Sequence, residues 1–186
     1  MVTVSVTAQT EKPSEGIYYS HESYAGFWRR LTVDVIDLLV IMTVSVIVTY
    51  LISSLTDVTE SLVPLLMLTW ATLWFSYFVL LKRSRFGTVG YRVCNVRIVN
   101  LHGETPGIFS LILRLCYAFV GPLSFPLDLI WISGDADRQA LRDKFAKTYV
   151  IKNSASPAGA GKIAYSTYDL WGWHLLFCEV KRGERT

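Results

Sequence analysis

Charged residues and metal-binding side chains are scarce in this sequence. Only 18% of its 186 residues are charged, whereas about a quarter is usual for a soluble domain. The three cysteines and three histidines are scattered along the chain, and neither set has the spacing of a zinc site or of a redox motif. No nucleophile–base set and no phosphate-binding loop is present. We therefore expect no enzyme activity, no cofactor and no metal.

The charge balance and the first residues bear on partners and targeting. A net charge of +3 gives no support for a nucleic-acid partner. Residues 1–24 have neither the apolar core nor the small-residue cleavage site of a secretory signal peptide. Their polar composition predicts a flexible arm over residues 1–23.

The sequence contains long apolar runs. Two of them extend from Leu31 to Ile52 and from Leu62 to Leu81. About 20 residues at ~1.5 Å per residue match the ~30 Å hydrocarbon core of a bilayer. A soluble protein with buried core helices is the alternative. The second run argues against it, because its only ionisable group is Tyr77 and it has no polar face for water. We expect a membrane protein embedded in the lipid bilayer.

Basic residues indicate how these runs are oriented. The connection at residues 53–61 has none, whereas residues 82–107 contain Lys82, Arg83, Arg85, Arg92 and Arg97. Cytoplasmic loops are enriched in lysine and arginine. The distribution predicts a multi-pass protein of the cell (inner) membrane, with its N-terminus and residues 82–107 in the cytoplasm.

A third apolar run, Ile108 to Ser133, is interrupted at Gly121-Pro122, where proline removes a backbone donor and clashes with the preceding turn. Five basic residues follow between Arg138 and Lys152, which is unusual on the outer face of a membrane. The pattern favours a re-entrant hairpin, or two short helices, that returns the chain to the cytoplasm. A single kinked crossing is the alternative. A hairpin would bring Arg114 and Asp128 to the same depth, where their charges can neutralise each other.

Two segments alternate between apolar and polar residues in the manner of strands, residues 91–100 and residues 147–152. They can pair only if both lie on one side of the membrane. The predicted fold class is an all-α membrane protein with two transmembrane helices, a broken third hydrophobic segment and a small cytoplasmic β ribbon. The predicted organisation is an arm (residues 1–23), a membrane domain (residues 24–152), and a linker with an aromatic tail (residues 153–186).

The linker prediction rests on the composition of "SASPAGAG", residues 154–161. The apolar part of the tail, Leu170 to Cys178, is too short to span a bilayer. Its tryptophans are typical of a segment that lies in the membrane interface. A strand or a partner-binding segment is an equal alternative.

Charged residues at the start of the first run carry the functional argument. Arg30, Asp34 and Asp37 are spaced by four, three and seven residues, so they share one face of a helix. Arg30 can reach Asp34 one turn along. Asp37 lies about 10 Å deeper than Arg30 and needs another partner, because a carboxylate in hydrocarbon is unfavourable.

Two sources of a partner for Asp37 are open. Thr69, Thr72 and Ser76 form a narrow polar stripe on the second run and can donate hydrogen bonds, as small hydroxyl residues do between membrane helices. Arg114 from the third run is the other. The functional interpretation is a proton or cation site, and the structural one is an Arg–Asp clamp that fixes helix packing.

With these residues identified, the chain resembles the RDD family of integral membrane proteins, which is named for one arginine and two aspartates. "YAGFWRRLTVDVID" is similar to the family's opening, with Arg30 as the arginine and Asp37 as the first aspartate. "FGTVGYRVCNVRIVNLHGETPGIFSLILR" is similar to the stretch after the second helix, and "ALRDKFAKTYVIK" to the closing segment, in which Asp143 is the second aspartate. The similarity covers residues 24 to 152.

The sequence departs from the family pattern at several positions. Asp34 stands where an apolar residue is more common, and Arg142 where histidine is common. Phe86 and Tyr91 replace a glycine and a lysine in the turn that contains Thr88, Gly90 and Arg92. The resemblance implies a membrane protein of a family without an established general function, for which transport, including sodium/proton exchange, has been proposed.

Two functions follow from these observations. In the first, the protein transports ions or small solutes by proton/cation exchange: Asp37 binds the proton or monovalent cation, Arg30 and Asp34 tune it, the hairpin gates access, and a homo-oligomer completes the pathway. In the second, it is a membrane-anchored interaction or scaffold protein with a structural Arg/Asp cluster. Asp143 is either a membrane-edge salt bridge or the group that holds Arg92 or Arg30. The candidate site residues are Arg30, Asp34, Asp37, Arg114, Asp128 and Asp143.

Overall fold

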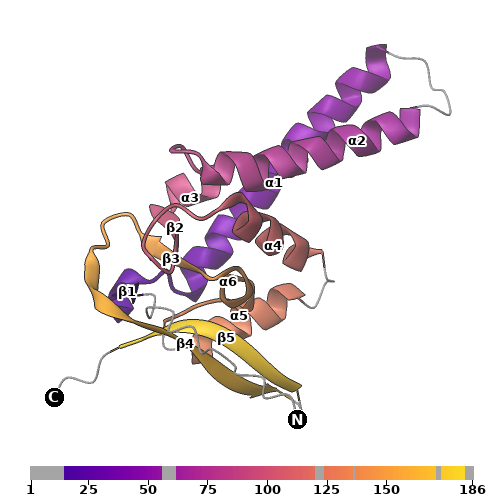
Figure 1. Ribbon diagram of the computed structural model, residues 1–186. Helices are drawn as coiled ribbons and strands as arrows, with labels where there is room; N and C mark the ends of the chain where they lie inside the picture. The colour runs from indigo at the N-terminus through magenta and orange to yellow at the C-terminus, as the bar shows by residue number, and fades with distance from the viewer. Residues whose placement is uncertain (1–14, 56–61, 120–123, 136, 171–172, 183–186) are drawn as a thin grey trace, which may run out of the picture.

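Two long helices dominate the computed structural model, which describes residues 15–55, 62–119, 124–135, 137–170 and 173–182. Helix α1 (Phe27–Leu55) and helix α2 (Leu62–Phe75) run back along each other and extend away from the rest of the chain (Figure 1). Helix α2 continues as a π-helical segment, η2 (Ser76–Leu81). Both are long and apolar enough to cross a membrane, and they expose large apolar side chains such as Leu39, Val46 and Met67. The prediction of two candidate membrane spans is confirmed.

The third apolar run forms two helices of 11 residues each, α4 (Ile108–Ala118) and α5 (Ser124–Gly134). This agrees with the two short helices predicted from the break in the run. The break itself, Gly121-Pro122, lies outside the described residues. Helix α6 (Leu141–Ala146) follows and packs against α4 and α5.

The predicted ribbon is present but shorter than expected. Strands β2 (Val96–Asn100) and β3 (Thr148–Lys152) pair antiparallel. Residues 91–93, predicted as part of the strand, instead belong to the short helix α3 (Val89–Val93). The reason is that the backbone N–H of Gly90 donates a hydrogen bond to Asp37 of α1, which directs this segment against α1 rather than into the sheet.

A second sheet was not predicted, so the all-α class is wrong in this respect. Strands β1 (Glu15–Tyr19), β4 (Pro157–Leu170) and β5 (Trp173–Lys181) form an antiparallel sheet in the order β1-β4-β5. Residues 15–19 of the predicted arm, and residues 157–161 of the predicted linker, are therefore strand. A 3-10 turn, η1 (His21–Ser23), leads into α1.

The small residues of the predicted linker explain why it can form a strand. A Cβ atom at Gly159 would lie 2.7 Å from the Cζ of Tyr18, and one at Gly161 would collide with the carbonyl oxygen of Lys181. Glycine at these two positions lets both neighbouring strands approach β4 closely. The composition that indicates a linker in the sequence is thus a requirement of the sheet.

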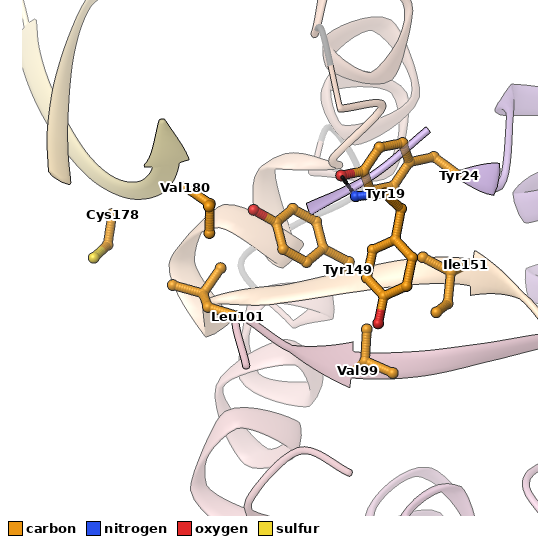
Figure 2. Close-up of a cluster of buried hydrophobic side chains, with 8 residues drawn as sticks. All are labelled: Tyr19, Tyr24, Val99, Leu101, Tyr149, Ile151, Cys178 and Val180. Atoms are coloured by element: carbon orange, nitrogen blue, oxygen red, sulfur yellow. Dashed lines mark hydrogen bonds between the residues drawn. The ribbon is translucent and has the colours of Figure 1, made fainter. Parts of the chain in front are cut away.

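One apolar cluster joins the two sheets. Figure 2 shows its eight buried side chains, Tyr19, Tyr24, Val99, Leu101, Tyr149, Ile151, Cys178 and Val180. The phenol oxygen of Tyr24 accepts a 3.1 Å hydrogen bond from the backbone N–H of Tyr19. A second cluster lies on the opposite face of β3, where Val150 packs with residues of α1, η2 and α4. Because side chains alternate along a strand, β3 connects the sheets to the helices.

Candidate functional site

Arg30, Asp34 and Asp37 lie on one face of α1, as predicted. Arg30 and Asp37 are 2% and 1% exposed, and the buried positions of α1 follow a helical period. Arg30 and Asp34, however, pair with adjacent residues of α6, whereas the partners of Asp37 lie in residues 77–90. The site is therefore built by several elements that converge on α1.

The second aspartate, Asp143, is the centre of a buried charge cluster. It lies in the first turn of α6, is fully buried, and forms ion pairs with the guanidinium groups of Arg30 and Arg114. Arg30 also donates to the carbonyl oxygens of Ala25 at 2.9 Å and Arg138 at 2.7 Å. Burial alone raises the pKa of Asp143, but Arg114 and Arg30 outweigh it and hold that pKa well below its usual value. The predicted contact between Asp143 and Arg30 is confirmed, whereas Arg92 forms no ion pair with it.

The next residue back, Arg142, forms a second charge cluster. Its guanidinium lies 2.5 Å from a carboxylate oxygen of Asp34 and 2.8 Å from one of Asp128. Its backbone N–H donates a 2.9 Å hydrogen bond to the other oxygen of Asp128. Arg142 thereby joins α1, α5 and α6 through one side chain.

Two predicted pairings are therefore wrong. Arg30 does not pair with Asp34, and Arg114 does not pair with Asp128. The physical reason is the same in both cases: α6 inserts between α1, α4 and α5, and its adjacent residues Arg142 and Asp143 point in different directions and take the partners. The charges are neutralised, but by α6 rather than by each other.

Asp37 has a different environment from the other carboxylates. It accepts hydrogen bonds from the hydroxyl of Thr88 at 2.6 Å, the phenol of Tyr77 at 2.8 Å and the backbone N–H of Gly90 at 2.7 Å. Among the described residues no lysine or arginine forms an ion pair with it. Gly90 must lack a side chain, because a Cβ there would lie 2.8 Å from Asp37 Oδ1 and closer still to the carbonyl oxygen of Val33.

The predicted partners of Asp37 were therefore wrong. Thr69 and Thr72 donate to backbone carbonyls four residues earlier in their own helix, which is the usual local bond of a hydroxyl in a helix. Arg114 is taken by Asp143. The predicted shared face located the carboxylate, but its donors come from η2, from the residue before α3 and from the first turn of α3.

Several residues of the site were not singled out by the sequence. The sequence distinguishes Tyr77 only as the one ionisable group of the second apolar run, and nothing in it indicates the hydrogen bond to Asp37. Lys144 pairs with Asp135 at 2.6 Å and with Glu179 of β5. Burial lowers the pKa of Lys144, but its bonds to these two carboxylates outweigh this and raise the pKa above its ordinary value. The sequence signal for these residues is the run of three charges Arg142-Asp143-Lys144. The structure shows that all three are partly or fully buried.

The arrangement does not indicate a metal site, because the described residues contain no group of three or more His, Cys, Asp or Glu placed to hold a metal ion. What it offers chemically is one carboxylate among hydroxyl groups, Asp37, beside two clusters of paired charges. A hydroxyl can donate to an ionised carboxylate and can accept from a protonated one. Two of the three donors to Asp37 are hydroxyl groups of this kind.

Comparisons with known proteins agree with the geometry. The profile of the RDD family matches residues 24–147. The chain is 27% identical over 135 residues to the "Uncharacterized protein YckC" of Bacillus subtilis (strain 168), covering 68% of this chain and 83% of that protein. No solved structure matches. Since the family profile spans most of the chain and includes Arg30, Asp37 and Asp143, this protein belongs to the RDD family and is a membrane protein.

Proposed function

We propose that the protein exchanges protons for a monovalent cation across the cell membrane, and that Asp37 is the group that takes up the proton or cation. The observation that carries this proposal is the environment of Asp37. It is 1% exposed, lies within the first candidate membrane span, and forms no ion pair in the described part of the chain. A buried carboxylate within a candidate span is costly, and at Asp37 only uncharged donors compensate it.

The contrast with the other carboxylates supports the choice of Asp37. Asp34, Asp128 and Asp143 each have an arginine as partner, and a guanidinium stays charged at every accessible pH. Through these ion pairs the three carboxylates hold the helices together. Asp37 has hydroxyl and amide donors only, so a change in its charge does not leave a buried arginine without a partner.

The pathway for such exchange requires more than one copy of the chain. Two candidate spans are too few to enclose a polar route, and the outer parts of α1 and α2 expose apolar side chains. We propose a homo-oligomer in which these faces meet or border lipid, with closed rotational symmetry as is usual for such assemblies.

The proposed topology returns the α4–α5 segment to the cytoplasm. Strand β2 precedes this segment and β3 follows it, and the two strands pair directly. Similarly, β1 precedes α1 and pairs with β4, which follows α6. A β ladder cannot pass through hydrocarbon as an open sheet, so both partners of each pair lie on one side. This supports an even number of crossings, with both sheets on the basic, cytoplasmic side.

The test uses purified protein in lipid vesicles with an internal pH indicator. Adding sodium to one side of a preformed pH gradient should collapse the gradient with wild-type protein. The variant Asp37→Asn should abolish this response, because the amide cannot exchange a proton. The matched control is Glu104→Gln, which removes an exposed carboxylate in the turn after β2 and should leave the response unchanged.

Equal responses from wild type and Asp37→Asn would contradict the exchange function. Size-exclusion profiles and melting temperatures of both proteins establish that the variant is folded.

A membrane-anchored interaction or scaffold protein is the second candidate. The observation that favours it is the full pairing of the charges around α6, which has the form of a clamp between α1, α4 and α5. In that case no gradient is dissipated by wild-type protein, and substitution of Asp143 rather than Asp37 has the larger consequence for the protein.

A further inference from the structure

A cavity of about 360 Å³ lies between α1, the end of α2 with η2, α4 and α6. Its walls are mostly apolar and include Leu38, Trp74 and Leu115. Leu38 and Phe119, which also line it, are 49% and 66% exposed on the surface that carries the apolar side chains of the long helices. The cavity thus borders the surface that faces lipid in the proposed topology. Its volume and its apolar lining are those of a site for a small ligand.

The opposite end of the cavity is charged. Asp34, Lys82, Arg114 and Arg142 line it. Three of these four are already paired, since Arg142 holds Asp34 and Arg114 holds Asp143. Lys82 is the exception, because no carboxylate forms an ion pair with it in the described part of the chain. The free cation of this cavity is therefore an ammonium group at the end of the second candidate span.

The position of Lys82 makes an anionic partner favourable. Its Nζ lies 4.6 Å from the ring centroid of Tyr91 and 5.6 Å from that of Phe78, so aromatic faces provide its nearest partial compensation. Burial, together with the charges of Arg114 and Arg142, lowers the pKa of Lys82 to about 7, although Asp34 and Asp37 oppose this. An anion beside it would restore the charged form.

Two further donors at this cavity lack acceptors. Trp74 Nε1 and Arg114 Nε are buried and have no hydrogen-bond partner among the described residues. Both residues line the cavity. Buried donors normally have a partner, and these two belong to residues that line the cavity beside Lys82.

We propose that this cavity binds an amphipathic anion, a carboxylate or phosphate head on a single acyl chain, with the head at Lys82 and the chain against Leu38, Trp74 and Leu115. The apolar walls suit the chain, and the mouth at Phe119 lets it enter from the lipid. The site does not rest on the exchange function, because Asp37 does not line the cavity. Failure of cation exchange would leave it standing.

The test measures binding by tryptophan fluorescence, with protein in neutral-lipid nanodiscs. A dodecanoate brominated at its terminal carbon quenches tryptophan on contact. Wild-type protein should be quenched saturably, and Trp74→Phe should lose most of that quenching. The brominated dodecanol of the same length tests whether the charged head matters, and it should bind at least about tenfold more weakly. Unlabelled dodecanoate and dodecyl phosphate then compete, and the stronger competitor identifies the head group.

Substitutions at the charged end provide the second arm. Lys82→Met keeps an unbranched, flexible side chain without the charge and should weaken binding about tenfold, the scale of one charge-assisted hydrogen bond. Lys82→Arg should stay within about twofold of wild type. The matched control is Arg83→Met, which removes an exposed charge on the next residue that does not line the cavity. Binding by wild type should also weaken as the pH rises through about 7, where Lys82 loses its charge.

Equal binding of the brominated acid and alcohol, or equal weakening by Lys82→Met and Arg83→Met, would overturn the proposal, because both results describe partition into an apolar surface. If Lys82→Met does not fold, the pH dependence of binding by wild type and by Lys82→Arg tests whether the charge at residue 82 is required.

Discussion

Asp143 joins two arginines that are far from it in sequence, and this single residue determines how α1, α4 and α6 meet. It is fully buried between the guanidinium groups of Arg30 and Arg114, and its position in α6 also lets it accept a hydrogen bond from the N–H of Ala140 at 3.3 Å. Removing one partner from a buried ion pair leaves the other charge uncompensated in a low-dielectric interior.

We therefore expect Asp143→Asn to lower the free energy of unfolding by about 3–5 kcal/mol. Glu104→Gln, which removes an exposed carboxylate, should change it by less than about 0.5 kcal/mol. Chemical unfolding in detergent, followed by intrinsic fluorescence, measures both values. Equal stabilities of the two variants would show that the cluster around Asp143 does not hold the fold.

The pH dependence of this contribution follows from the lowered pKa of Asp143. A carboxyl whose pKa is lower in the folded state contributes its full stabilisation above the unfolded pKa of about 3.9, and loses it as the pH falls below that value. The stability difference between wild type and Asp143→Asn should be constant near neutral pH and shrink below about pH 4. A difference that instead declined between neutral and alkaline pH would assign the effect to another group.

Sequence reasoning located the charged residues of the site but predicted only one of their pairings, Asp143 with Arg30, and that one as one of several alternatives. Helical spacing within α1 placed Arg30 and Asp37 on one buried face, because that depends on local geometry alone. The partner of Arg30 lies 113 residues away, and its position depends on how α6 packs. No local pattern carries that information, although the family resemblance included Asp143.

At the scale of elements, the contact between α3 and α1 depends on a missing side chain. Gly90 lies against the carbonyl oxygen of Val33 and donates its backbone N–H to Asp37. The hydroxyl of Thr88, the residue before α3, holds the other carboxylate oxygen. Thr88 and Gly90 can therefore hold the carboxylate of Asp37 only while the backbone of α3 stays close to that of α1.

Gly90→Ala should separate α3 from α1 and lower the free energy of unfolding by about 1–3 kcal/mol, because an added methyl group overpacks this contact. The matched control is Gly107→Ala before α4, where a Cβ atom meets nothing within 4 Å. Thermal unfolding of both variants in detergent provides the comparison. If Gly107→Ala has the larger effect, the close approach at Gly90 is not a constraint.

Elements were predicted best where one property decided them. Apolar length alone identified the two long helices, and period-two alternation identified β2 and β3. The strands β1 and β4 were missed because their environment is another part of the chain: the small residues of β4 have no strand pattern of their own. For the apolar part of the tail the sequence permits three alternatives, and the strand is the one found.

At the scale of the whole molecule, the two sheets constrain the membrane topology that we propose. Each pairs a segment before an apolar region with a segment after it. Only the reporter enzyme that is active in the cytoplasm should therefore show activity when it is fused after Lys152. The same result is expected for insertion after Gly103, in the turn that follows β2. The measurement uses paired reporters, one active in each compartment.

Opposite locations for the two fusion sites would require a single crossing between them and would break the pairing of β2 with β3. The control is fusion after Leu55, at the end of α1. There, only the reporter that is active outside the cytoplasm should show activity.

The pairing of β1 with β4 also sets an order of events during synthesis. Tyr19 pairs with Pro157, which follows it by 138 residues (157 − 19). At ~5–20 residues per second, a ribosome needs roughly 7 to 28 seconds to deliver that partner. We expect the long helices to reach the translocation machinery during this interval. Tyr19 and Tyr24 are then not yet covered by the side chains of β3 and β5. Closure of the sheet is thus a late, post-insertion step, and a nascent chain released before it would expose an aromatic surface to chaperones and proteases.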